Sequence, residues 1–212
     1  MRTWASSNRD GEAVYDDRVK RDISSAKVVF LDRDGVINRK MPEGQYVKAW
    51  SQFHLLPGAA EAIVKLKRAG LLVIVITNQR GIALGLYRAE DVDRIHARLQ
   101  QELRAQNAQI DAFYICPHDR DTCNCRKPLT GLFEQAKAAF PEIQLETSLL
   151  VGDSLSDIEF GRSLGLTTIL IEGDMNGGDR DIRDVRASQL ADLCFPSLSD
   201  AVDAVLGSRI AR

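Results

Sequence analysis

The stretch VVFLDRDGVIN, residues 28–38, decides how the chain folds. Its first four residues form a continuous apolar run, which is typical of a strand buried on both faces in a parallel sheet. Asp32 then falls at the carboxyl end of that strand, where open α/β sheets bind their ligands. Gly35 lets the chain turn at once, so Asp32 and Asp34 can converge on one metal-bound phosphate. This geometry suits a carboxylate nucleophile beside a second carboxyl group that transfers protons, and the alternative is an exposed turn after a strand.

The other apolar segments predict an alternation of strands and helices. Residues 90–107, for example, carry apolar side chains at steps of three and four, which is typical of an amphipathic helix. By the same reasoning we expect strands at residues 28–31, 71–76, 113–115, 148–151 and 167–171, and helices at residues 57–70, 90–107, 130–140, 156–164 and 201–206. Residues 173–184 are expected to form a solvated loop. Such an alternation predicts an α/β fold with a doubly wound, mostly parallel sheet, whose catalytic loops gather along one edge.

The length and charge of the chain restrict its organisation and its partners. Its 212 residues suffice for one core, so residues 27–212 are expected to form a single domain and the polar residues 1–26 a flexible N-terminal extension. The net charge is −2 and the Lys and Arg residues are scattered, which argues against nucleic acid or a membrane surface as a partner. No stretch of the sequence approaches the roughly 20 apolar residues of a membrane-spanning helix. We therefore expect a cytoplasmic monomer that binds a small molecule.

Two further segments carry groups that bind phosphate. Residues 77–81, Thr-Asn-Gln-Arg-Gly, bring a hydroxyl, an amide and backbone N–H groups to the end of the second strand, where they either cradle a phosphate or cap the next helix. Arg126 and Lys127 pair a forked donor with a compact charge. Lys127 could neutralise a transferring phosphoryl group while Arg126 holds a second anion, although a basic pair before proline is also a common surface feature.

A second pair of carboxylates follows the fourth strand. Asp153 is positioned to complete the oxygen ligands of a Mg²⁺ ion together with Asp32. Asp157 lies one helical turn later and either supports that site or favours the start of a helix. His96 stands alone on its expected helix, so an ordinary structural role is expected for it. Cys194 lies between apolar neighbours, which predicts a buried thiol in a terminal strand.

A cluster of sulfur and nitrogen ligands lies between the third strand and Lys127. Cys116, His118, Cys123 and Cys125 fall within ten residues and supply a full tetrahedral set for Zn²⁺. Because four protein ligands leave no open position, this metal is expected to be structural and to fix the loop that presents Lys127. Redox-active cysteines and a chance grouping are the alternatives.

These segments together resemble the four motifs of the haloacid dehalogenase superfamily of phosphotransferases. The motif residues are, in order, Asp32 and Asp34, then Thr77 and Asn78, then Lys127, then Gly152, Asp153 and Asp157. Residues 116–128 narrow the resemblance to the zinc-containing branch that holds D-glycero-D-manno-heptose 1,7-bisphosphate 7-phosphatases and histidinol-phosphate phosphatases. Residues 44–47 and 77–83 look more like the heptose enzymes, whereas Ser154 replaces a lysine found in many of them. The resemblance covers about residues 27–172.

The resemblance implies a Rossmann-like fold. A large cap domain has no room, because only 44 residues separate Asp32 from Thr77 and 49 separate Thr77 from Lys127. Residues 39–54 and the zinc loop would then enclose the substrate. The substrate-binding residues implied are Tyr46, Thr77, Asn78, Gln79, Arg80, Arg126 and Lys127, of which Tyr46, Arg80 and Arg126 are candidates to contact the distal phosphate and the sugar.

The resemblance also implies a mechanism. Asp32 would attack phosphorus to form an aspartyl-phosphate, and Asp34 would protonate the leaving hydroxyl and then activate water. Mg²⁺ held by Asp32, Asp153 and the backbone carbonyl of Asp34 would offset charge together with Lys127. The implied function is removal of the 7-phosphate of D-glycero-D-manno-heptose 1,7-bisphosphate, which yields heptose 1-phosphate for nucleotide-activated heptose and surface polysaccharide synthesis. The alternatives are a histidinol-phosphate phosphatase, a polynucleotide phosphatase and a non-catalytic binding module stabilised by zinc.

Overall fold

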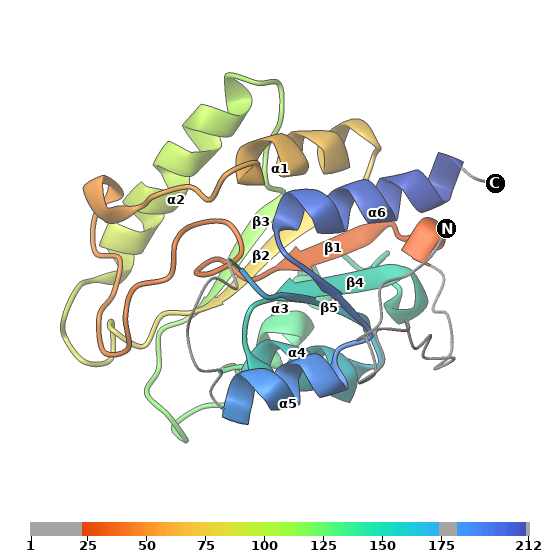
Figure 1. Cartoon of the computed structure of the whole chain (residues 1–212). Helices are drawn as coiled ribbons and strands as arrows, with labels where there is room; N and C mark the ends of the chain where they lie inside the picture. The colour runs from red at the N-terminus through yellow and green to blue at the C-terminus, as the bar shows by residue number, and fades with distance from the viewer. Residues whose placement is uncertain (1–22, 174–181, 211–212) are drawn as a thin grey trace, which may run out of the picture.

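A parallel sheet between two layers of helices forms the centre of the molecule (Figure 1). The computed structural model describes residues 23–173 and 182–210. Within them the six-stranded sheet has the order β3-β2-β1-β4-β5-β6, and every pair of neighbouring strands is parallel. The strands are β1 Val28–Leu31, β2 Leu72–Asn78, β3 Ala112–Cys116, β4 Ser148–Gly152, β5 Thr167–Ile171 and β6 Leu193–Phe195. The expected α/β fold class is confirmed.

Six α-helices of the described residues cover the two faces of this sheet. Helices α1, α2 and α6 lie on one face and α3, α4 and α5 on the other (Figure 1). Their bounds are α1 Ala59–Arg68, α2 Ala89–Arg104, α3 Gly131–Ala139, α4 Leu155–Leu164, α5 Ile182–Leu190 and α6 Leu198–Ile210, and short 3-10 helices are η1 Ile23–Ser25, η2 Trp50–Gln52 and η3 Leu145–Thr147. Between β1 and α1 the fully described connection contains η2 and no cap domain.

The side chains of β1 fill both cores of the molecule. Val29 and Leu31 pack in the core under α1 and α6, whereas Val28 and Phe30 pack in the core under α3 and α4. The ring of Phe30 lies 5.6 Å from that of Phe133 on α3. Because successive side chains of a strand point to opposite faces and both faces are covered, a continuous apolar run forms this strand.

The crevice that can bind a ligand lies between the carboxyl ends of β1 and β4. These neighbouring strands lead to helices on opposite faces, since β1 is followed by α1 and β4 by α4 (Figure 1). Such a reversal opens a crevice at the sheet edge, and this is where doubly wound folds bind their ligands. Asp32 follows β1 and Asp153 follows β4, so the topology brings both carboxylates to the crevice.

Two helices differ from those expected. Helix α5 begins at Ile182, inside the expected loop 173–184, and Ala187 is its single buried residue, so its apolar pattern is too weak to predict it. Helix α6 extends well beyond the expected 201–206. Residues 174–181 of the expected loop, and residues 1–22 of the expected N-terminal extension, lie outside the described residues.

The two ends of the described chain pack against the body of the domain. Ile23 of η1 contacts the core and Ala26 is buried. The terminal strand β6 exists as expected, but the prediction of a buried Cys194 is wrong, because this thiol is exposed. As β6 is an edge strand whose Leu193 and Phe195 pack against the core, the intervening residue points to the less covered side.

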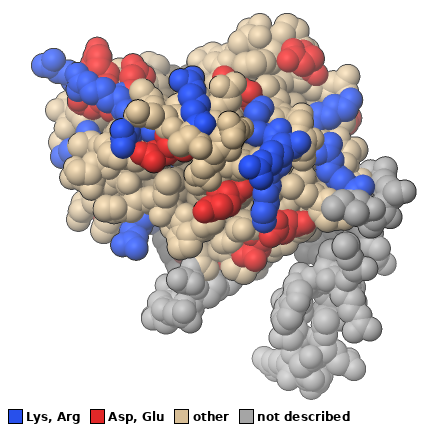
Figure 2. All heavy atoms as spheres, turned by 90° about the horizontal axis from the view of Figure 1, so that it is seen from above, with Lys and Arg blue, Asp and Glu red and all other residues tan. Residues whose placement is uncertain are grey.

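The surface of the described residues carries charges of both signs. On the face seen in Figure 2, Lys and Arg side chains are mixed with Asp and Glu and form no continuous basic stripe. Among the helices in the two described ranges, none is long and apolar enough to cross a membrane.

Candidate active site

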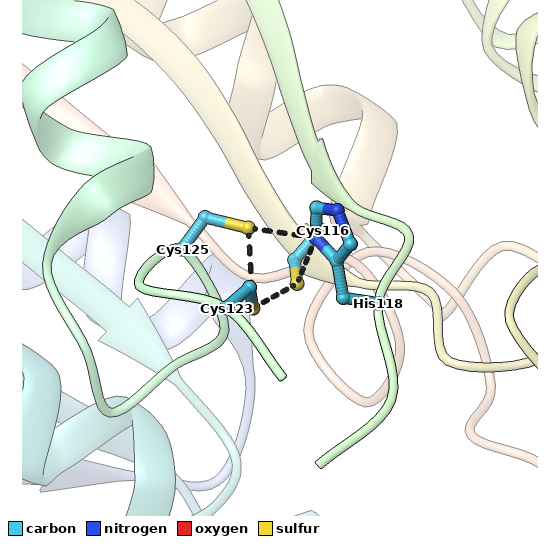
Figure 3. Close-up of side chains that lie close together, drawn as sticks. All are labelled: Cys116, His118, Cys123 and Cys125. Carbon is cyan, nitrogen blue, oxygen red and sulfur yellow. Dashed lines mark hydrogen bonds between the residues drawn. The ribbon is translucent and has the colours of Figure 1, made fainter. Parts of the chain in front are cut away.

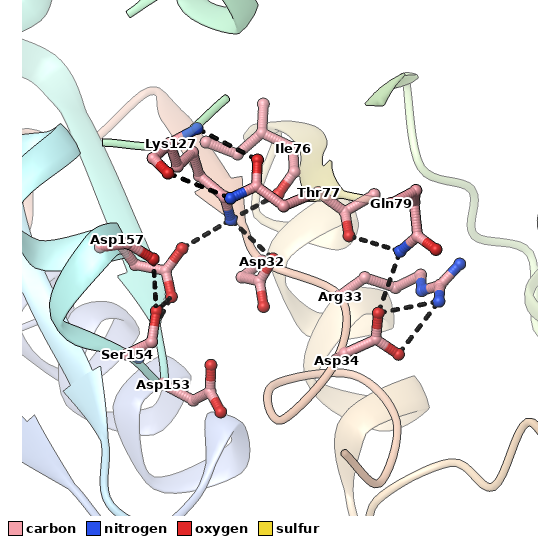
Figure 4. A network of polar contacts seen from close by, with 12 residues as sticks. Asp32, Arg33, Asp34, Ile76, Thr77, Gln79, Lys127, Asp153, Ser154 and Asp157 are labelled. Carbon is pink, nitrogen blue, oxygen red and sulfur yellow. Dashed lines mark hydrogen bonds and ion pairs between the residues drawn. The ribbon is translucent and has the colours of Figure 1, made fainter. Parts of the chain in front are cut away.

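The carboxylate of Asp32 lies in the crevice and is held by Lys127 (Figure 4). The Asp32 N–H donates to the Val151 carbonyl at 2.9 Å, which continues the pairing of β1 with β4 by one residue. Lys127 Nζ lies 2.6 Å from Asp32 Oδ1 and 2.5 Å from Asp157 Oδ1, and it donates to the Ile76 carbonyl at 3.0 Å. All three charged side chains are buried. Two acids therefore share one buried ammonium group.

This arrangement separates the pKa values of the two acids. Burial raises the pKa of Asp32 to about 7, because the attraction of Lys127 does not outweigh desolvation and the negative charges of Asp157 and Asp153. Burial also disfavours ionisation of Asp157, but Lys127 and a hydrogen bond from Ser154 hold its pKa below the ordinary value. Burial alone would lower the pKa of Lys127, yet the two carboxylates raise it. Lys127 is thus a permanent cation beside a carboxyl group that titrates near neutral pH.

Asp153 completes a group of three carboxylates. One oxygen each of Asp32, Asp153 and Asp157 lies within 4.8 Å of the others. Gly35 has φ of +103°, and a Cβ there would lie 2.1 Å from Asp153 Oδ2, so the turn after β1 requires glycine to admit this carboxylate. Lys40 Nζ lies 2.6 Å from the same oxygen. Carboxylate oxygens around one point are the ligands that Mg²⁺ prefers, so these residues fit a divalent cation.

Asp34 belongs to a second polar network and is directed toward Arg33 and Gln79 (Figure 4). Arg33 Nη2 donates to its two oxygens at 3.0 and 2.8 Å. Asn38 Nδ2 and Gln79 Nε2 donate to it at 2.9 and 3.0 Å. Burial alone would raise the pKa of Asp34, but Arg33 and these hydrogen bonds hold it below the ordinary value. Asp34 is therefore a carboxylate in the free protein at neutral pH.

Arg33 is a site residue that sequence reasoning missed. Its side chain is fully buried, with its guanidinium 5.9 Å from the ring centroid of Phe53 and its Nη1 3.4 Å from His96 Nε2. Burial, followed by the charge of Arg33, lowers the pKa of His96 to about 3, so the imidazole is neutral. His96 stacks on Phe113 with centroids 4.2 Å apart, which confirms its structural role. The signal for Arg33 was a charged residue placed between two candidate catalytic acids, Asp32 and Asp34.

The residues at the end of β2 hold Lys127 in position. Asn78 Oδ1 accepts a hydrogen bond from the Lys127 N–H at 3.1 Å, and Asn78 Nδ2 donates to the Lys127 carbonyl at 3.2 Å. The buried Thr77 hydroxyl accepts from Gln79 Nε2 at 2.9 Å, and Gln79 Oε1 accepts from the Tyr87 hydroxyl at 2.7 Å. Asn78 thus fixes the backbone of the lysine, while the Thr77 hydroxyl keeps its proton for a ligand.

A cavity of about 520 Å³ opens beside Asp34. Its walls are formed by residues 40–47, among them Lys40 and Tyr46, and by Asn78, Gln79, Arg80, Arg120 and Arg126. Arg80 Nε pairs with Asp119 Oδ1 at 2.5 Å, whereas Arg126 Nη1 is buried and has no hydrogen-bond partner within the described residues. The cavity brings together Tyr46, Arg80 and Arg126, as expected, and adds Lys40 and Arg120, which sequence reasoning had not singled out. A buried guanidinium nitrogen without a partner suits an anion.

The cluster of Cys116, His118, Cys123 and Cys125 lies where β3 ends (Figure 3). The sulfur of Cys123 lies 3.6 Å from that of Cys116 and 3.5 Å from that of Cys125, and His118 Nδ1 lies 3.8 and 3.2 Å from the sulfurs of Cys116 and Cys125. Tetrahedral Zn²⁺ bonds would separate two sulfurs by about 3.8 Å and a sulfur and a nitrogen by about 3.6 Å. The cluster therefore has the donor set and the spacing of a closed four-ligand metal site.

Comparisons with known proteins agree on one family. A family model described as HAD-hydrolase-like matches residues 124–201. The D-glycero-alpha-D-manno-heptose-1,7-bisphosphate 7-phosphatase of Mycobacterium tuberculosis is 43% identical over 159 residues, which cover 72% of this chain and 83% of that protein. The D-glycero-beta-D-manno-heptose-1,7-bisphosphate 7-phosphatase of Pseudomonas putida is 38% identical over 147 residues, 69% of this chain and 82% of that protein.

A solved structure gives the same result. The D,D-heptose 1,7-bisphosphate phosphatase from B. bronchiseptica, crystallised with magnesium and phosphate, superimposes with a TM-score of 0.73 and 29% sequence identity. The match covers 85% of this chain and 98% of that chain. The similarity therefore extends over nearly the whole of the solved domain.

Proposed function

Because the chain belongs to the haloacid-dehalogenase-like hydrolases, in the family of the heptose bisphosphate phosphatases, we propose that it hydrolyses the 7-phosphate of D-glycero-D-manno-heptose 1,7-bisphosphate. The product would be heptose 1-phosphate, the substrate for nucleotide activation on the way to surface polysaccharides. The observation that carries this proposal is the position of Asp32. Its carboxylate lies 2.6 Å from a buried ammonium group and beside two further acids, and the nearby Asp34 lines a cavity that carries arginines.

The cluster of three carboxylates, Asp32, Asp153 and Asp157, is proposed to form a site for Mg²⁺. Asp32 and Asp153, with the backbone carbonyl of Asp34, would be its protein ligands, and their hard oxygen donors support this choice. Asp157 Oδ1 is already engaged by Lys127, and its other oxygen accepts from Ser154, so Asp157 would support the site without direct ligation. When bound, the ion would polarise the phosphoryl oxygens and offset their charge.

In the first step Asp32 attacks phosphorus in line with the bond to the sugar oxygen. That bond breaks with its electron pair on the sugar oxygen, which takes the proton carried by Asp34, and an aspartyl-phosphate and heptose 1-phosphate result. In the second step Asp34, now a carboxylate, takes a proton from water as the water oxygen attacks phosphorus. The bond to Asp32 breaks, inorganic phosphate leaves, and both side chains are restored. Lys127 remains ionised and stabilises negative charge in both steps.

Asp34 needs a proton for the first step, although Arg33 keeps its pKa low in the free protein. A phosphate dianion that enters the crevice adds negative charge near this carboxylate, and like charges raise the pKa of a carboxyl group. The substrate itself would therefore prepare Asp34 to act as the acid. Once the leaving oxygen has taken the proton, the pairing with Arg33 favours the carboxylate that the second step requires.

The second phosphate is proposed to bind Arg126 in the wall of the cavity. Its buried Nη1, which has no hydrogen-bond partner within the described residues, supports this assignment. Arg80 and Tyr46 line the same cavity. Asn78 uses both atoms of its amide on Lys127, so we assign it to positioning the lysine. The amide of Gln79 is likewise engaged, by Asp34, Thr77 and Tyr87, so we assign Gln79 to orienting Asp34 and Thr77 to binding a phosphoryl oxygen. Arg126→Met should raise KM for the bisphosphate at least tenfold and leave KM for heptose 7-phosphate unchanged. The matched control is Arg94→Met, which removes an exposed arginine on α2.

The cluster of Cys116, His118, Cys123 and Cys125 is proposed to hold a structural Zn²⁺ ion. Its spacing and its donor types support zinc, and four protein ligands leave no position for a substrate. The ion would fix the loop that ends at Lys127. A cytoplasmic location and a monomeric state stay predictions from the sequence.

Phosphate release from several substrates tests the proposal. The enzyme, with Mg²⁺, is given the α and β anomers of D-glycero-D-manno-heptose 1,7-bisphosphate and, in parallel, histidinol phosphate. We expect turnover of a heptose bisphosphate anomer at a kcat/KM at least a hundredfold above that for histidinol phosphate. Asp32→Asn should abolish turnover while the circular dichroism spectrum stays unchanged. A preference for histidinol phosphate, or an active Asp32→Asn variant, would contradict the assignment.

A further inference from the structure

The ammonium group of Lys40 forms an ion pair with Asp153, a proposed ligand of the cation. Its Nζ is 2.6 Å from Asp153 Oδ2, and no other hydrogen bond of the Lys40 side chain occurs within the described residues. The Lys40 side chain is 55% exposed, while that of Asp153 is only 12% exposed. The acid is therefore fixed in the crevice, and the ammonium group reaches it from outside.

The backbone on the N-terminal side of Lys40 is anchored, so its side chain can move without the chain. Asn38 forms a bridge with Leu55, and the Arg39 N–H donates to the His54 carbonyl at 2.8 Å. Lys40 follows directly and lines the 520 Å³ cavity as well as touching Asp153. Rotation about its side-chain bonds is enough to carry the ammonium group from the carboxylate into the cavity.

The charges of the crevice favour an exchange of cations. With Asp32, Asp153 and Asp157 ionised and Lys127 and Lys40 protonated, the sum is −1; replacing Lys40 by a divalent cation changes it to 0. Lys127 is a poor candidate to leave, because it is buried and has three partners. The Lys40 side chain is half exposed and has a single partner among the described residues, Asp153, so breaking this ion pair costs little free energy.

We propose that Lys40 competes with the divalent cation for Asp153 and, once displaced, turns into the substrate cavity, where its charge meets the phosphorylated sugar. Lys40 would then be a positioning residue that couples the two binding events. The cation binds more weakly because of Lys40, and the loaded protein gains a positive charge in the cavity. This inference rests on the proposed function in one respect, because both take the cluster of Asp32, Asp153 and Asp157 as a cation site.

Calorimetric titration with Mg²⁺ in the absence of substrate tests the competition. Lys40→Met should bind Mg²⁺ about threefold to tenfold more tightly than the wild-type protein, because the carboxylate no longer has to release an ammonium group. Lys48→Met removes the same charge from an exposed position of the same loop and should bind Mg²⁺ within twofold of the wild type. Equal affinities for wild type and Lys40→Met, equal effects of both substitutions, or no saturable Mg²⁺ binding would each overturn the inference.

A second measurement follows the ammonium group itself. Lysines are reductively dimethylated with ¹³C-formaldehyde and a borane reductant, which keeps their charge, and the Lys40 signal is identified by its loss from the spectrum of Lys40→Met. That signal should shift with Mg²⁺ along the same saturation curve as the calorimetric signal, and a stationary signal would contradict displacement. Both measurements need no turnover. Tighter binding by Lys40→Met in a protein that hydrolyses no sugar bisphosphate would refute the proposed function alone, and unchanged binding in an active phosphatase would refute the inference alone.

Discussion

Replacing the proposed nucleophile by its neutral isostere should stabilise the Mg²⁺-free protein. Burial raises the pKa of Asp32 from 3.8 to about 7, so ionisation of this group opposes folding. The cost is absent below pH 3.8, where the carboxyl group is protonated in both states, and it is complete above pH 7. With about 1.4 kcal/mol for each pKa unit, it amounts to roughly 4 kcal/mol at pH 8 and roughly 2 kcal/mol at pH 5.5. Asp32→Asn removes this titration and keeps an oxygen for Lys127.

Urea denaturation of the zinc-loaded, Mg²⁺-free proteins measures the effect. We expect the free energy of unfolding of Asp32→Asn to exceed that of the wild type by up to about 4 kcal/mol at pH 8 and by about half as much at pH 5.5. Saturating Mg²⁺ should reduce the difference, because the ion binds the ionised wild-type carboxylate. Asp93→Asn, an exposed position on α2, should change stability by less than about 0.5 kcal/mol. An Asp32→Asn variant that is less stable than the wild type at pH 8 would refute the reasoning.

Three further substitutions test the crevice and the cluster of Cys116, His118, Cys123 and Cys125. Gly35→Ala puts a methyl group against Asp153 Oδ2. It should lower kcat more than tenfold in a phosphate-release assay and lower the free energy of unfolding by more than about 2 kcal/mol in urea denaturation. A wild-type kcat would contradict the close approach. Arg33→Met removes the charge that lowers the pKa of Asp34, so the limb of the pH–kcat/KM profile that reports Asp34 should move to higher pH, and an unmoved limb would exclude this pairing. Cys123→Ser should lower Tm by more than about 5 °C and abolish stoichiometric zinc in elemental analysis, whereas a variant with wild-type Tm and zinc would disprove the metal cluster.

Local patterns in the sequence were sufficient for most of the fold. Because β1 is buried on both faces, its continuous apolar run was enough to predict the strand. The cysteine and histidine spacing is likewise local, and the structure brings those four side chains together. Helix α5 was missed because it buries Ala187 alone, and the exposure of Cys194 depends on which strand forms the edge of the sheet.

The polar contacts of the candidate site were harder to predict, because they join distant parts of the chain. The ion pair of Lys40 with Asp153 spans 113 residues, and the pairing of Asn78 with the Lys127 backbone spans 49. No short pattern encodes such contacts. The burial of Arg33 is a different case, since a charged side chain is ordinarily predicted at the surface. Its burial is compensated by the carboxylate of Asp34 and by the ring of Phe53.

The short loop between His118 and Cys123 has both ends in the cluster, since His118 Nδ1 and the sulfur of Cys123 lie 3.2 and 3.5 Å from the sulfur of Cys125. A change in the length of this loop therefore need not move Lys127, whose backbone is also held by two hydrogen bonds with Asn78. Extra residues inserted after His118 would enlarge a closed surface loop at a small entropic cost and leave the lysine where it is. Only Arg126 separates Cys125 from Lys127, so this connection has no such freedom. The loop can therefore vary in size while the charge of Lys127 stays at the same place beside Asp32.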